Sequence, residues 1–97
     1  MINTIYPEIV TLSDYKVIET PSGLNVTISL YAKEPVFVKE ILIIFPQERK
    51  TIYRISEIYI ESPYIFKVRV PQRGLYTIIV KYTWRGMERI YKNIIKV

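Results

Sequence analysis

Apolar side chains recur at every second residue along most of this chain, and this spacing restricts the fold more than any other feature. In the stretch LNVTISLYA, one face carries Leu24, Val26, Ile28, Leu30 and Ala32. A period of two is typical of a strand with one buried face, because successive side chains of a strand point to opposite sides of the sheet. The stretch YIFKVRV repeats the pattern, with Lys67 and Arg69 on the outward face. No window favours a long helix, since β-branched residues and tyrosine dominate throughout.

Proline and glycine interrupt this pattern every ~9 to 15 residues, a cadence that indicates a sandwich or barrel. The interrupting stretches are TPSG, KEP, PQERK, ESP, PQRG and RGM. We therefore expect one all-β antiparallel domain over residues 1–97, with seven or eight strands. The strands are expected at about 4–19, 24–32, 36–45, 51–60, 64–70, 75–84 and 88–97. Because Pro7 cannot donate to a central ladder, the first region is either one bent strand or two short ones.

The composition leaves little material for catalysis. The chain has no histidine and no cysteine, so it lacks the usual general base, a thiolate nucleophile and the commonest metal ligand. Its three glycines form no phosphate-binding loop, and its carboxylates are scattered without calcium-loop spacing. Ser13 and Lys16 stand three apart, but no other element of a serine–lysine enzyme follows them. We predict a protein that is not an enzyme, with no catalytic residue, no bound metal and no cofactor.

Two further expectations concern membranes and origin. The longest apolar run, ILIIF at residues 41–45, falls far short of the ~20 residues that a membrane helix needs, so we expect no membrane span. Isoleucine occurs 18 times, asparagine and glutamine are scarce, and the charged residues are mostly Lys, Arg and Glu. Hyperthermophile proteins share this bias. The composition therefore predicts a thermophilic source, either an archaeon or an archaeal virus.

The net charge of +5 is unevenly distributed along the chain. Residues 1–48 carry three lysines and six acids (3 − 6 = −3), and residues 49–97 carry eleven Lys or Arg and three acids (11 − 3 = +8). Basic residues interleaved with aromatic ones can bind single-stranded nucleic acid through charge and stacking. The candidate anion contacts are Arg54, Lys67, Arg69, Arg85 and Arg89. Ordinary solvation of outward strand faces is the alternative explanation of these charges.

Two strand regions are apolar on both faces, which is unusual for a small sandwich. VFVKEILIIF is two-sided after Glu40, and RIYKNIIKV places Ile90 and Ile94 on one face with further apolar residues on the other. Such strands need cover on both sides, which a loop or another chain could supply. The candidate protein interface comprises Phe37, Ile41, Ile43, Phe45, Tyr91, Ile95 and Val97. Ordinary exposure of a few apolar side chains is the alternative reading.

The segment QRGLYTI resembles the start of strand F in immunoglobulin-like domains, where an acid is followed by glycine or alanine and then by tyrosine. The resemblance implies that Gly74 and Tyr76 form a structural corner, with the tyrosine hydroxyl bonded to nearby backbone, and that Ile78 takes the core position. Gln72 replaces the usual acid, and the cysteine pair and early tryptophan of antibody domains are missing. The resemblance implies an immunoglobulin-like or fibronectin type III-like β-sandwich.

Taken together, these features predict a non-enzymatic module that acts through protein contacts. It would either self-associate, for example as a homodimer, or serve as an accessory domain of a larger assembly. A nucleic-acid-binding β-domain that uses the basic C-terminal half is the alternative. Fold-level likeness does not choose between these functions.

Overall fold

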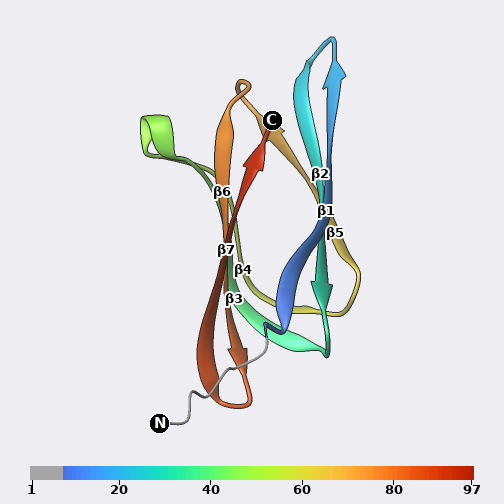
Figure 1. Ribbon diagram of the computed structural model, residues 1–97, viewed down its shortest axis with the longest axis vertical. Helices are drawn as coiled ribbons and strands as arrows, with labels where there is room; N and C mark the ends of the chain where they lie inside the picture. The colour runs from blue at the N-terminus through green and yellow to red at the C-terminus, as the bar shows by residue number, and fades with distance from the viewer. Residues whose placement is uncertain (1–7) are drawn as a thin grey trace, which may run out of the picture.

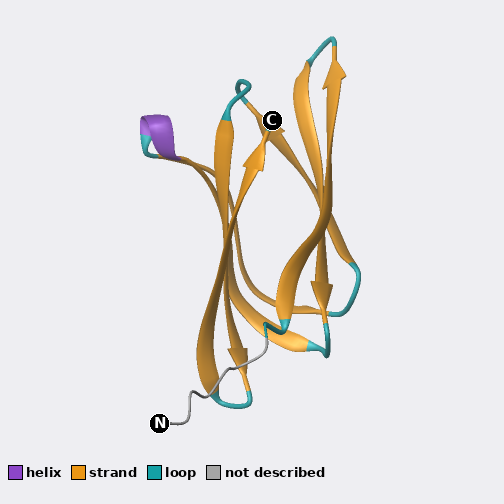
Figure 2. Cartoon of the chain, in the orientation of Figure 1, coloured by secondary structure: helices purple, strands orange, loops and turns teal. Residues whose placement is uncertain are grey.

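The computed structural model describes residues 8–97, which form two antiparallel sheets that face each other (Figure 1). The first sheet has three strands in the order β1–β2–β5, and these are β1 (Val10–Thr20), β2 (Gly23–Ala32) and β5 (Tyr64–Val70). The second has four in the order β4–β3–β6–β7, and these are β3 (Val36–Phe45), β4 (Lys50–Ile60), β6 (Leu75–Trp84) and β7 (Met87–Lys96). One 3₁₀ turn, η1 (Pro46–Glu48), connects β3 to β4 (Figure 2).

The predicted all-β antiparallel sandwich is confirmed, with seven strands in residues 8–97. The first predicted region begins as a strand only at Val10, and the part of that prediction that covers residues 4–7 lies outside the described residues. All six connections between the strands coincide with the proline- and glycine-containing stretches, because those residues fix or free the backbone where it must reverse. Within the part of the chain that is described, no helix has the length and apolarity required to cross a membrane.

The core lies between the two sheets and is built from alternate residues of every strand. The fully buried side chains include Val26, Ile28, Leu30, Ile41, Ile43, Phe45, Tyr76, Ile78, Val80 and Ile95. One aromatic pair joins strands that belong to different sheets. The ring of Tyr53 stacks on that of Phe66 at 5.2 Å, which links β4 to β5 across the open side of the sandwich.

A tyrosine corner closes the connection between β5 and β6. The Tyr76 hydroxyl donates to the backbone carbonyl of Gln72 across 2.5 Å, which is the contact that the resemblance implied. Gly74 adopts φ 148°, and a Cβ atom there would lie 3.1 Å from the ring of Phe45. The positive φ therefore favours glycine, and an added Cβ would press on the Phe45 ring. Burial raises the pKa of Tyr76 above its ordinary value.

Tyrosine hydroxyls also fasten β1 to the four-stranded sheet. The backbone N–H of Leu12 donates to the Tyr91 hydroxyl at 3.0 Å, and that of Ile9 donates to the Tyr82 hydroxyl at 3.3 Å. In the opposite direction, the N–H of Lys96 donates to the hydroxyl of Tyr15 at 3.2 Å. A buried tyrosine needs a polar partner for its hydroxyl, and these edge amides supply it. The aromatic residues of β6 and β7 are therefore core residues that join the sheets.

Candidate protein-interaction surface

The outer face of the four-stranded sheet carries several exposed apolar side chains. Strand register places its side chains in rows that cross β4, β3, β6 and β7. One row runs Thr51, Ile44, Thr77 and Ile94; the next runs Arg54, Leu42, Ile79 and Lys92; a third runs Ser56, Glu40, Lys81 and Ile90. The inward neighbours of these residues form the core, so the rows face solvent.

We define the apolar patch by the residues Ile44, Leu75, Ile79, Ile90 and Ile94. Ile90 and Ile94 are each 61% exposed and Leu75 is 55% exposed, whereas Ile44 and Ile79 are partly buried between them. Directly opposite and diagonal neighbours on one sheet face lie within contact range, so these side chains form one surface. Exposed apolar residues that gather in this way mark interaction sites more often than isolated ones do.

A hollow of about 460 Å³ lies at one end of the patch. It is lined by Pro46, Gln47, Gly74, Leu75, Thr77 and Ile94. Thr77 is small beside its neighbours, which lowers the surface at its position. Figure 1 shows η1 standing off the four-stranded sheet on the side away from the other sheet, so the turn forms a wall beside the hollow. The surface is therefore hollowed next to Leu75 and Ile94.

Charged groups surround the patch. Glu40 lies 3.7 Å from both Arg54 and Lys81, and Glu88 accepts a hydrogen bond from Lys39. That bond, together with the charge of Lys39, holds the pKa of the Glu88 carboxyl below its ordinary value. Exposed ion pairs of this kind contribute little to stability. They do orient charge at the rim of the apolar surface.

Most of the predicted interface residues point into the core and not to the outer face of the four-stranded sheet. The side chains of Ile41, Ile43, Phe45 and Ile95 are fully buried, and those of Tyr91 and Val97 are each 8% exposed. Only Phe37 lies on the outer face, where its ring is 5.3 Å from that of Tyr59. The two-sided apolar character of β3 and β7 was recognised correctly. On both strands, the other residues predicted for the interface are the ones that contact the opposite sheet.

The five candidate anion contacts do not form one site. Arg54 lies on the outer face of β4, whereas Lys67 and Arg69 lie on the outer face of β5 in the other sheet. The remaining two, Arg85 and Arg89, lie near the turn between β6 and β7. Their guanidinium carbons are 4.7 Å and 5.8 Å from the ring centre of Trp84. These distances suit cation–π contacts within the domain.

No cluster of carboxylates suitable for holding a metal ion occurs among residues 8–97. The hydroxyl of Ser13 donates to the carbonyl of Ser29 at 3.1 Å and lies 3.0 Å from the Ser29 hydroxyl. Ser13 lies at the bulge where the register of β1 and β2 shifts between Leu12 and Asp14, and both of its hydrogen-bond partners belong to β2. These contacts give the serine a structural role.

Sequence reasoning missed Leu75, Ile79 and Ile44 as surface residues. The useful signal was the pair Ile90 and Ile94, which share a face of β7 with Glu88, Lys92 and Lys96. An apolar pair on the charged face of a strand is more informative than one on a wholly apolar face.

Searches of protein-family models, curated proteins and solved structures found no match to this chain.

Proposed function

We propose that this protein is a non-enzymatic interaction module with an immunoglobulin-like fold, which self-associates through the outer face of its four-stranded sheet. The observation that carries the proposal is the exposure of Leu75, Ile90 and Ile94 on that face, with the partly buried Ile44 and Ile79 between them. Full burial of such a side chain contributes about 1.5–3 kcal/mol. Association costs at least ~4 kcal/mol in lost freedom of motion. The patch alone therefore supports weak, concentration-dependent association.

Strand order and corner geometry support the immunoglobulin-like part of this proposal. A sandwich with the orders β1–β2–β5 and β4–β3–β6–β7 has the three-plus-four arrangement expected of a fibronectin type III-like domain. The bond from Tyr76 to the carbonyl of Gln72 adds a second feature of that superfamily. Neither feature alone identifies a function.

The outward side chains of β7 favour a second copy of the chain as the occupant of the patch. They read Glu88, Ile90, Lys92, Ile94 and Lys96. Around a two-fold axis at Lys92, two antiparallel copies bring Glu88 opposite Lys96 and Ile90 opposite Ile94. Isologous contacts of this kind are the commonest in homo-oligomers. The like-charged contact at Lys92 is eased because long lysine side chains can turn their ammonium groups into water.

Sedimentation equilibrium over a range up to about 1 mM tests the proposal, since weak dimers have dissociation constants in the range of micromolar to millimolar. We expect the double variant Ile90→Lys and Ile94→Lys to weaken association by at least about tenfold, which equals 1.4 kcal/mol. Ile18→Lys is the matched control, because Ile18 is also exposed (42%) but lies in the other sheet. It should leave association unchanged.

A charge exchange examines the two-fold arrangement itself. Lys96→Glu alone and Glu88→Lys alone should each weaken association, and the two changes together should restore it. A protein that stays monomeric at the highest concentration would overturn the proposal. So would equal effects of the patch variant and the Ile18→Lys control.

A further inference from the structure

Two sheets have four edge strands, and on one side of this sandwich several outward amides already have side-chain partners. The outward N–H of Leu12 on β1 bonds to the Tyr91 hydroxyl, and that of Lys96 on β7 bonds to the Tyr15 hydroxyl. The N–H of Ile94 is taken by the side chain of the adjacent Asn93 at 2.8 Å. An added strand would have to displace these partners, so β1 and β7 are poor sites for strand addition.

The edge of β4 is irregular. Glu57 has φ 56°, in the left-handed region, and the pairing of β3 with β4 shifts register between Ile43 and Ile44. Such irregularities bend an edge strand and interrupt the straight row of donors and acceptors that another strand needs. The remaining edge, β5, has neither feature. It pairs with β2 over seven consecutive residues without a register shift.

The outward backbone groups of β5 follow from the alternation of the ladder. Thr20 and Gly23 pair across a two-residue turn, and the N–H of Lys33 donates to the carbonyl of Ile9. Odd-numbered residues of β2 therefore bond to β1, and even-numbered ones bond to β5. It follows that Ile65, Lys67 and Arg69 direct their N–H and C=O groups away from the sheet. Within residues 8–97, no strand pairs with this edge.

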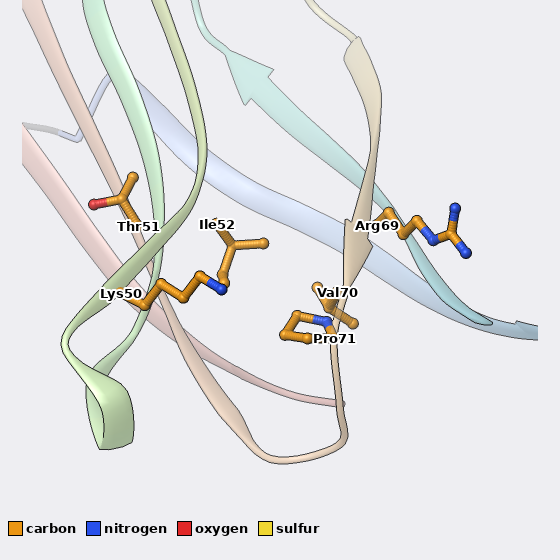
Figure 3. A pocket seen from close by; sticks show the side chains of 6 residues that line it. All are labelled: Lys50, Thr51, Ile52, Arg69, Val70 and Pro71. Carbon is orange, nitrogen blue, oxygen red and sulfur yellow. The ribbon is translucent and has the colours of Figure 1, made fainter.

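A cleft of about 330 Å³ lies beside the end of this edge, between β4 and β5. Its lining residues are Lys50, Thr51, Ile52, Arg69, Val70 and Pro71. Figure 3 shows Ile52 on the β4 side facing Val70 and Pro71 on the β5 side, while the side chain of Arg69 points away. A strand added to β5 would project alternate side chains over this gap, where apolar groups would contact Ile52.

The other side chains of an added strand would lie beside the exposed cations of β5. The cross-strand neighbours of Lys67 and Arg69 on β2 are Thr27 and Asn25, which are neutral. Among the described residues, no carboxylate pairs with Lys67, and the guanidinium of Arg69 donates to the carbonyl of Ser22. Cross-strand pairs of opposite charge are favourable and like charges directly opposite are not. A second copy paired antiparallel with full overlap would set Lys67 against itself.

We propose that the β5 edge accepts an extended segment of a different protein, in which apolar and acidic residues alternate, as an additional antiparallel or parallel strand. Backbone hydrogen bonds would give the affinity, and the two side-chain rows would give the specificity. The apolar residues would lie over the cleft and the acidic residues beside Lys67 and Arg69. This surface is separate from the apolar patch and does not depend on self-association.

The probe is a labelled peptide of about nine residues with alternating valine and glutamate, which is long enough to span the seven residues of β5. Binding is measured by fluorescence anisotropy, and amide exchange is followed by NMR. We expect protection of the N–H groups of Ile65, Lys67 and Arg69. A valine–lysine peptide, and a peptide with the same valines and glutamates in two blocks, should each bind at least about tenfold more weakly. Equal binding of the block peptide, or unchanged amide exchange, would overturn the proposal.

Two variants of one residue separate backbone pairing from charge. Lys67→Thr removes the charge and keeps the outward N–H, whereas Lys67→Pro removes both, and proline is tolerated on the solvent side of an edge strand. Lys67→Pro should bind the valine–glutamate peptide at least about tenfold more weakly than Lys67→Thr. If Lys67→Pro fails to fold, the double variant Lys67→Glu and Arg69→Glu should instead prefer the valine–lysine peptide. An unchanged preference there would refute the proposed pairing.

The patch variant Ile90→Lys and Ile94→Lys keeps this test independent of self-association. It should bind the valine–glutamate peptide with the affinity of the unaltered protein. Loss of peptide binding in that variant would place the site on the four-stranded sheet and overturn its assignment to β5.

Discussion

The Tyr91 hydroxyl lies 3.0 Å from the backbone nitrogen of Leu12, and it also accepts a hydrogen bond of 2.8 Å from the side-chain amide of Asn93. One phenol thus satisfies an amide of the first strand and a side chain of the last. A partly buried amide that loses its partner destabilises the folded state by about 1–3 kcal/mol.

Tyr91→Phe is therefore expected to lower the free energy of unfolding by about 1–3 kcal/mol. Chemical denaturation gives the loss, and faster hydrogen exchange at the Leu12 amide would locate it. Tyr31→Phe is the matched control, because Tyr31 is 47% exposed on the outer face of β2. Similar losses in the two variants would contradict a specific role for the Tyr91 hydroxyl.

Because Tyr76 is buried, we expect the free energy of unfolding to fall at alkaline pH. Burial raises the pKa of Tyr76, and of Tyr53, above the ordinary value, so folding favours the neutral phenol. This contribution to stability is fully present below the unfolded-state pKa of about 10 and is lost as the pH rises through the higher folded-state pKa. Denaturation curves between about pH 8 and 11.5 should show the fall. The fall should be smaller in Tyr76→Phe, and an equal fall would exclude Tyr76 as a contributor.

Two adjacent residues on β7 should differ sharply in how much the same substitution destabilises the domain. Ile95 is fully buried and Ile94 is 61% exposed. Ile95→Lys places an unpaired charge in the core and should cost more than about 4 kcal/mol, enough to unfold a marginal domain. Ile94→Lys should change stability by no more than about 0.5 kcal/mol, as surface substitutions usually do. Thermal unfolding of both variants, followed by circular dichroism, tests the register of the strand.

The composition continues to predict a thermophilic protein. We expect a thermal midpoint above about 90 °C at neutral pH, which is the range of hyperstable domains. Differential scanning calorimetry measures it directly. A midpoint of about 45–65 °C, where mesophilic domains cluster, would contradict the prediction.

The strands could be read from the sequence because their signals are local. Alternation from Leu24 to Ala32 and from Tyr64 to Val70 fixed both the extent and the buried face of β2 and β5, since only one face of each was consistently apolar. The turns were equally local, because proline and glycine act where they stand.

The interface could not be read in the same way, because β3 and β7 offer two apolar faces. On β7 the choice lies between Ile90 with Ile94 and Tyr91 with Ile95. The second set faces the core, where the hydroxyl of Tyr91 accepts a hydrogen bond from an amide of β1 that lies 79 residues away in the chain. On β3 the pairing with β6 shifts between Val38 and Glu40, which changes the phase of the alternation midway. Both the contact of Tyr91 and the shift in β3 depend on residues that are distant in the sequence.

The tyrosine bonds between β1 and β7 also have a mechanical consequence. The two strands run side by side in the same direction, since Leu12 and Tyr15 of β1 meet Tyr91 and Lys96 of β7 in that order (Figure 1). A force that pulls the beginning of β1 and the end of β7 apart would slide one strand along the other. The hydroxyl contacts would then be loaded together and would have to break in concert, so the domain should resist stretching along its length.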